Sequence, residues 1–219
     1  MNFHTTRPLL NALVPLILLA TLAVTPEAQG AGSKGKKGKK FPLVNPVQFS
    51  IVGGISYGGD DIGDPFTVNI GDDSSTSHSI KAGNLLLANA RATFNFSNSF
   101  GVHLGAGYQV DTIKADNGSM EFSRNKIELI PFYRTEESFR LGLGITADLG
   151  PTYNRSVDGS ADEEITFDDA LGAVFDVSYD PLKSPFTAGF KLQYVDYVDS
   201  ESGDEYAGSH GALYLGLEF

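Results

Sequence analysis

The sequence contains no cysteine and no tryptophan, and basic residues are scarce relative to acidic ones. Without cysteine, the chain has no disulfide framework, no thiolate metal site and no cysteine nucleophile. The formal net charge is −11, so a nucleic-acid partner is not expected, because binding phosphate requires a basic surface. Beyond residue 30, no run is long and apolar enough for a spanning helix, so any membrane crossing must be made by strands.

The one long apolar run lies near the N-terminus. Arg7 precedes an apolar stretch over residues 9–24, and Ala28-Gln-Gly30 has the small-x-small pattern of a cleavage site. The run is short for a membrane span and Pro15 interrupts it, which favours a cleaved signal peptide over residues 1–30 rather than a membrane anchor. The sequence therefore predicts an exported protein.

Residues 31–43 follow as a segment rich in lysine and glycine, which we expect to be a flexible periplasmic tail. The segment carries five lysines, whereas the chain from Phe41 onward has ten basic and twenty-six acidic residues. The tail and the body therefore differ in sign. We interpret the tail as a solubilising spacer, with attraction to anionic phospholipid headgroups or to an acidic partner as the alternative.

From Val47 onward, apolar side chains alternate with small or polar ones, as in strands with two different faces. We expect eight strands, over residues 47–57, 85–96, 100–110, 122–133, 139–149, 165–179, 186–194 and 212–219. Short connections alternate with long acidic ones at residues 58–84, 111–121, 150–164 and 196–209. Short periplasmic turns and long outer loops are typical of bacterial outer-membrane barrels. The predicted fold is an all-β, eight-stranded antiparallel transmembrane β-barrel with up-and-down meander topology over residues 44–219.

The last strand shows the pattern most clearly, because its apolar face would be an aggregation hazard in a soluble protein. We interpret this face as lipid-facing and as the C-terminal signal read by the barrel-assembly machinery; it comprises Leu213, Leu215, Leu217 and Phe219. Aromatic residues in the outward register flank each short turn and predict an interfacial girdle: Phe49, Phe96, Phe100, Tyr133, Phe139, Tyr179, Phe186 and Phe219. Tyr57, Tyr108 and Tyr194 are candidates for an outer girdle. Pro131 cannot donate to a strand ladder and predicts a bulge or local distortion.

In architecture, residues 44–219 resemble the small outer-membrane barrels of the OmpA and OmpX type. The sequence also resembles an uncharacterised group of proteobacterial small barrels, through Gly58-Gly-Asp60, Ile80-Lys-Ala-Gly83, Gly107-Tyr-Gln109, Asn117-Gly118, Phe122-Ser-Arg124 and Arg140-Leu-Gly-Leu-Gly144. The resemblance implies a location in the outer membrane of a Gram-negative bacterium. It also implies contact with outer-membrane lipids, including lipopolysaccharide. It transfers no active site.

Charged residues of both signs fall on the inward faces of the expected strands. The predicted lumen charge network comprises Arg91, Arg124, Lys126, Glu128, Arg140, Asp148, Asp168, Asp176, Lys191 and Glu218. Arg91, Glu128 and Lys191 are expected at one depth and to approach one another, and His103 and Asp176 at another. Buried charges need partners, and side chains fill an eight-stranded barrel. The sequence therefore predicts a plugged lumen and a structural or interaction scaffold, with a narrow or gated channel as the alternative.

The outer loops supply two further hypotheses, neither of which the sequence favours. Asp60-Asp-Ile-Gly-Asp64 has hard oxygen ligands but lacks the full spacing of a calcium loop. Ser209-His210 is the one candidate for a lipid-modifying enzyme, but neighbouring strand residues point to opposite faces and cannot form a dyad. We therefore predict no catalytic residue, metal or cofactor, and a monomeric protein.

Overall fold

The computed structural model describes residues 45–219, apart from 70–74, 136–137, 160 and 182–183. The predicted signal peptide and basic tail lie outside the described residues. Every regular element within the described part is a strand. A search of the same residues finds no helix with the length and apolarity needed to cross a membrane.

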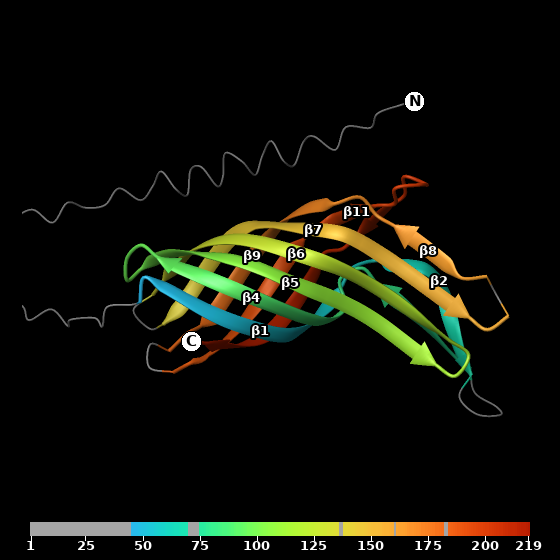
Figure 1. Cartoon of the computed structure of the whole chain (residues 1–219), viewed down its shortest axis with the longest axis horizontal. Coiled ribbons are helices and arrows are strands. Elements are labelled where there is room, and N and C mark those ends of the chain that lie inside the picture. Colours follow the sequence, from blue (N-terminus) through green and yellow to red (C-terminus); the bar gives the residue numbers. More distant parts are fainter. Residues whose placement is uncertain (1–44, 70–74, 136–137, 160, 182–183) are drawn as a thin grey trace, which may run out of the picture. The chain divides into compact units, whose positions relative to one another are not determined.

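Eight strands close into one antiparallel barrel, each pairing with the next along the chain (Figure 1). The strands are β1 (Val47–Gly58), β4 (Leu85–Asn95), β5 (Phe100–Ala115), β6 (Gly118–Arg134), β7 (Phe139–Val157), β9 (Ala170–Tyr179), β10 (Phe186–Tyr194) and β13 (His210–Glu218). Pairing of β1 with β13 joins the first strand to the last. The predicted all-β, eight-stranded antiparallel barrel is confirmed.

The junction of the first and last strands carries a continuous ladder. The register runs from Ser50 opposite Glu218 to Gly58 opposite His210. Beyond it, the Phe49 amide donates to the Phe219 carbonyl at 3.2 Å and the Phe219 amide donates to the Phe49 carbonyl at 2.9 Å. The apolar last strand therefore has no free edge, because β10 pairs with its other side.

The outer surface of the barrel is an apolar band. Outward side chains such as Leu141, Leu143 and Ile145 on β7 are about two-fifths exposed although they are fully apolar. Each inner girdle aromatic is eight positions along its strand from its outer counterpart, as in the pairs Phe49 and Tyr57, Phe100 and Tyr108, and Phe186 and Tyr194. At about 3.3 Å per residue this spans about 26 Å along a strand, or about 20 Å along the membrane normal at a tilt of about 40°. An apolar surface of about that height is suited to contact with the interior of a bilayer and would be unfavourable in water.

Past the outer girdle, the barrel continues as strands where we expected irregular loops. β5, β6 and β7 run on beyond the barrel, and two hairpins stand beside them: β2 (Asp61–Asn69) with β3 (Ser75–Lys81), and β11 (Asp196–Val198) with β12 (Glu205–Ala207). The expected strand over residues 165–179 is wrong as a single element. It divides into β8 (Glu163–Thr166), which pairs with the outer part of β7, and β9, which belongs to the barrel.

Of the bulge or local distortion predicted at Pro131, the structure shows no bulge, but the β6–β7 ladder is interrupted there, between the pairs Leu129–Ile145 and Phe132–Gly142. Pro131 faces Val102 in an unshifted register on one side, and the β6–β7 register is the same before and after it. A proline leaves one acceptor of the ladder unpaired without inserting a residue. The β6–β7 register shifts instead near residues 123–125, opposite Gly150 and Pro151. Gly150 has φ +55°, the left-handed conformation that a bulge of this kind often requires.

Candidate functional site: the lumen and its outer lid

A buried ion pair crosses the middle of the lumen. Lys191 on β10 donates its ammonium to both carboxylate oxygens of Glu128 on β6, at 2.5 and 2.7 Å. Asn89 on β4 donates to the same carboxylate at 2.9 Å. Lys191 is 4% and Glu128 1% exposed. Since these three strands are not neighbours around the barrel, the contact ties opposite walls together.

A second cross-lumen contact involves Arg91. Its guanidinium lies 3.7 Å from the Asp176 carboxylate on β9 and stacks over the Tyr214 ring at 4.7 Å. The Tyr214 hydroxyl donates to Asp176 at 2.8 Å. Of the three residues expected at one depth, Glu128 and Lys191 therefore form a direct pair, whereas the nearest acidic partner of Arg91 is Asp176. The stagger of tilted strands explains the difference, because equal counts along two strands do not give equal heights.

Asp148 on β7 is the acidic centre of the outer part of the lumen and is fully buried. Its carboxylate lies 3.1 Å from Arg124 Nε and 3.6 Å from Lys126 Nζ, both on β6. Gln193 Nε2 also donates to it at 3.3 Å, and the hydroxyl of Tyr197 on β11 donates to it at 2.5 Å. One carboxylate thus compensates two cations and binds a hairpin outside the barrel.

The end of the lumen near the short turns holds a third group. Arg134 and Arg140 both contact the Asp180 carboxylate, and Arg140 Nη2 donates to Glu218 at 2.7 Å. His103 lies next to this group, but its partners are Thr93 Oγ1 at 2.8 Å and Arg140 at 3.4 Å rather than Asp176. Because the arginine can only donate to Nε2, the proton of the neutral imidazole lies on Nδ1.

The structure brings nine of the ten predicted lumen residues inside the barrel and leaves one outside. Asp168 is exposed in the break between β8 and β9, where its carboxylate accepts a hydrogen bond from Ser200 at 2.9 Å. Its placement in the lumen was wrong, because the prediction extended the alternation of β9 towards the N-terminus, whereas β9 begins only at Ala170.

Sequence reasoning also missed several lumen residues. Arg134 and Asp180 were assigned to short turns. Each continues the alternation of inward and outward side chains of its strand, so the sequence pattern could have identified both as inward-facing. Neutral partners such as Asn89 and Gln193 carried no charge signal. Tyr197 comes from a loop, and the pattern of the barrel strands contains nothing that predicts its contact with Asp148.

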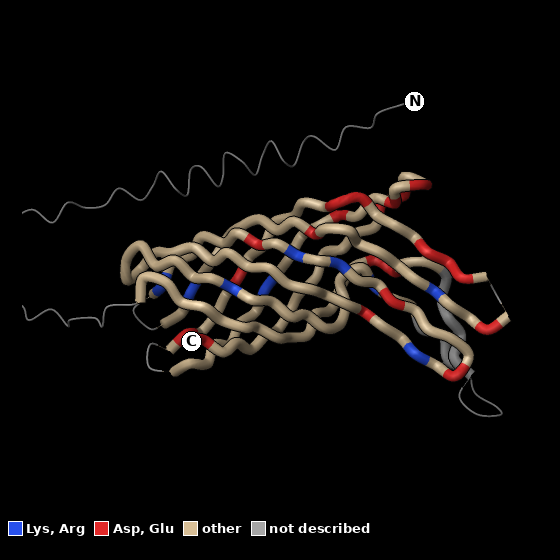
Figure 2. Tube along the Cα trace, in the orientation of Figure 1, with Lys and Arg blue, Asp and Glu red and all other residues tan. Residues whose placement is uncertain are grey.

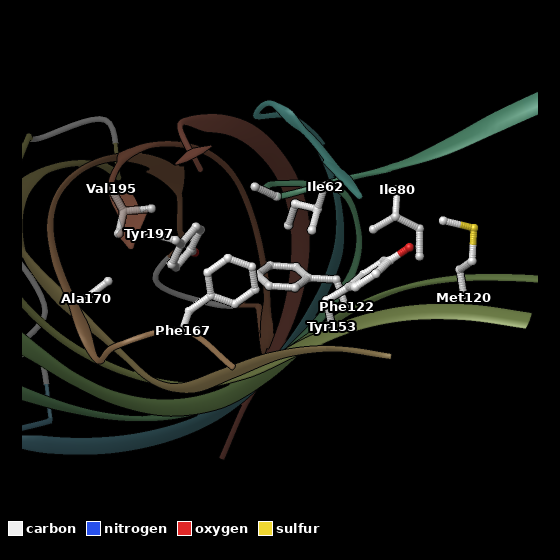
Figure 3. Close-up of a cluster of buried hydrophobic side chains, with 10 residues drawn as sticks. Ile62, Ile80, Met120, Phe122, Tyr153, Phe167, Ala170, Val195 and Tyr197 are labelled. Atoms are coloured by element: carbon white, nitrogen blue, oxygen red, sulfur yellow. The ribbon is translucent and has the colours of Figure 1, made fainter. Parts of the chain in front are cut away.

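A cluster of buried apolar side chains lies at the outer end of the barrel (Figure 3). We call it the lid cluster; its members are Ile62, Ile80, Ala82, Met120, Phe122, Tyr153, Phe167, Ala170, Val195 and Tyr197, each at most 7% exposed. The Phe122 ring packs edge-on against Phe167 at 5.6 Å and against Tyr197 at 5.5 Å. Most of these residues lie in the segments expected to be long acidic loops, whose few apolar residues are spread over distant parts of the chain.

Hydrogen bonds hold the outer segments together around this cluster. The Asp60 amide donates to the Ala207 carbonyl at 2.7 Å, and the Ala207 amide returns a bond to the Asp60 carboxylate at 2.9 Å. Arg124 Nη1 donates to the Ala82 carbonyl at 2.6 Å, and its guanidinium lies over the Phe122 and Tyr197 rings at 5.2 and 5.3 Å. The first and fourth outer segments are therefore fastened to one another, and Arg124 on β6 contacts both.

Burial raises the pKa of the Tyr197 hydroxyl well above its usual range, and the neighbouring Asp148 carboxylate adds to the shift. A pKa raised in the folded state gives stability that is complete below about pH 10 and is lost as pH rises further. We expect the free energy of unfolding in detergent to fall above pH 10, and to fall less in Tyr197→Phe. Urea unfolding from pH 8 to 12 measures both slopes; identical slopes would contradict the assignment.

Ser209 and His210, the candidates for a lipid-modifying enzyme, do not form a catalytic dyad. The Ser209 hydroxyl has no hydrogen-bond partner among the described residues, and His210 Nδ1 donates to the Gly208 carbonyl at 2.7 Å. Within the described residues, no group of three or more histidine and acidic side chains could hold a metal ion. The described residues therefore supply neither a Ser209–His210 dyad nor a metal-binding cluster.

The exposed acidic residues gather beyond the membrane band (Figure 2). They include Asp60, Asp61, Asp158, Asp162, Glu163, Glu164, Glu201, Asp204 and Glu205. Lys81 binds Asp61 at 2.8 Å, and this hydrogen bond lowers the pKa of the Asp61 carboxyl. The described part of this surface carries few other cations, so it presents mainly negative charge.

Comparison with solved structures gives the same fold. The attachment invasion locus protein Ail of Yersinia pestis, solved in complex with the heparin analogue sucrose octasulfate, is 16% identical, with a TM-score of 0.50 over 80% of this chain and 100% of Ail. Neisserial surface protein A is 12% identical, with a TM-score of 0.47 over 80% of this chain and 98% of that one. The chain is a small eight-stranded barrel of the outer-membrane type.

The barrel lies in the outer membrane of a Gram-negative bacterium, since this fold and its apolar band with aromatic girdles are those of outer-membrane proteins. No protein-family model matches the chain, and no curated protein matches its sequence. At this level of identity, the likeness to solved structures shows the barrel architecture and transfers no ligand.

Proposed function

We propose that the protein is a non-enzymatic outer-membrane scaffold with a plugged lumen, which displays an acidic surface outside the cell. The buried Glu128–Lys191 pair is the observation that carries this proposal, because it ties opposite walls at mid-lumen. The cavity beside the pair has a volume of about 10 Å³. This is about the room that one water molecule requires, and too little for a hydrated ion.

The acidic outer surface indicates what kind of partner the scaffold would take. Ail was solved with a polyanion, but a negatively charged rim would repel sulfated or phosphorylated chains unless divalent cations bridged them. A basic protein or peptide is the better electrostatic match. We also propose contact with lipopolysaccharide, assembly by the barrel-assembly machinery through Leu213, Leu215, Leu217 and Phe219, and a monomeric state.

Electrical recording tests the plugged lumen. Refolded wild-type protein in planar bilayers is expected to give no steady single-channel conductance, because paired side chains fill the lumen. A gel that compares heated with unheated samples verifies in parallel that the barrel has formed. A heat-dependent mobility shift together with steady ion conductance would overturn the plugged scaffold and favour the narrow channel.

A further inference from the structure

Two chemically different layers close the lumen in series. The inner layer is polar and consists of the Glu128–Lys191 and Arg91–Asp176 contacts. The outer layer is the lid cluster, in which all members are apolar or aromatic (Figure 3). A small cavity, which we call the chamber, lies beside the Glu128–Lys191 pair, with Gln109, Gln193 and His210 among its lining residues.

The two layers differ in what holds them. The polar layer depends on side chains that cross between barrel walls. The lid cluster joins side chains of outer segments to others on barrel strands, and two hydrogen bonds between Asp60 and Ala207, one of them to the Asp60 carboxylate, fasten two of the outer segments. Loss of the Glu128–Lys191 pair removes no member of the lid cluster, and loss of Phe167 removes no ion pair.

Asp148 is the residue at which the layers meet. Its carboxylate binds Arg124, Lys126 and Gln193 on the lumen side and the Tyr197 hydroxyl on the lid side. Because it is fully buried and compensates two cations, it holds its position independently of the hairpin. The Tyr197 hydroxyl therefore has a fixed acceptor, and this hydrogen bond holds β11 at the outer end of the lumen.

We propose that the lid cluster is an independent outer seal, latched by Tyr197 on Asp148, which keeps external solutes out of the lumen even when the polar layer is broken. The proposal rests on the proposed plugged lumen and extends it. Opening the lid alone exposes the chamber around Gln109 without creating a pore, and breaking the polar layer alone leaves the barrel closed.

A single introduced cysteine reports on the outer seal, because the chain has no other cysteine. Gln109→Cys is placed at the chamber, where Gln109 is 1% exposed. Vesicle-embedded protein is treated from outside with a membrane-impermeant maleimide. Labelling is expected to be slow with the intact lid and at least about tenfold faster when Phe167→Ala and Tyr197→Ala are added, since two core rings are lost.

The polar layer is broken separately with Glu128→Met and Lys191→Met, which leave no unpaired charge at that position. Conductance is expected to be absent in the lid variant and in the polar-layer variant, and Gln109→Cys labelling is expected to stay slow in the polar-layer variant with an intact lid. Conductance of the polar-layer variant alone, or unchanged labelling after the lid is opened, would overturn the outer seal. Conductance of the wild-type protein would instead overturn the plugged lumen itself.

A second lid variant tests the latch without removing the two core rings, so that the test does not depend on the folding of the Phe167→Ala and Tyr197→Ala variant. A Cβ at Gly208 would lie 2.1 Å from a carbon of the Tyr197 ring, so Gly208→Ala must displace the latch while leaving both rings in the chain. It is expected to accelerate Gln109→Cys labelling, whereas the surface substitution Asp204→Asn is expected to leave it unchanged. Unaltered labelling in Gly208→Ala, with a normal heat-dependent mobility shift, would refute the latch.

Discussion

Glu128→Ala is expected to lower the free energy of unfolding by about 3–5 kcal/mol, because it leaves Lys191 and its neighbour Arg91 buried with less compensating charge. The Lys191 ammonium makes both of its hydrogen bonds in this layer to that carboxylate. Urea unfolding of the refolded barrel in vesicles, followed by tyrosine fluorescence, measures the loss. The temperature of the gel mobility shift should fall in parallel.

The double variant Glu128→Met/Lys191→Met is the matched control. It removes both charges and fills similar volume, so its free energy of unfolding is expected to be close to that of the wild type, or higher by about 1–4 kcal/mol. Equal losses in the single and double variants would show that packing rather than charge compensation sets the effect. An unchanged single variant would mean that water reaches the lumen and solvates the ammonium.

Leu143→Arg is expected to destabilise the inserted barrel by about 2–4 kcal/mol, because it places a cation on the lipid face near the middle of the membrane. Leu143 lies outward on β7, four residues from the girdle residue Phe139. The same urea titration in lipid vesicles measures the change. The penalty should shrink in detergent micelles, where water penetrates more easily.

Ser156→Arg provides the control on the same strand. Ser156 is exposed on β7 beyond the apolar band, where an added arginine is expected to change stability by no more than about 0.5 kcal/mol. If the two substitutions cost the same, the membrane boundary inferred from the girdles is misplaced.

The sequence was most informative where structure depends on a single strand. Each face assignment within β4, β5, β7, β9 and β10 rests on that strand's own alternation, and inward residues such as Arg91 and Asp176 were identified in this way. The same reasoning failed at Asp168, which lies in a break between two strands, and at Tyr197, where a segment outside the barrel supplied the partner. It also left open which charges meet, because alternation gives the face but not the height of a side chain.

The alternation of apolar and polar residues, the girdle aromatics and the lengths of the connections determined the eight-stranded barrel by themselves, because the period of two is a local property of extended chain. Only the tertiary structure decided that Glu128 meets Lys191, that Arg91 meets Asp176, and that distant outer segments share one apolar core. Those contacts cross the lumen or join separate loops. They depend on barrel shear and on how the loops fold over the opening, and neither is encoded in the pattern of any one segment.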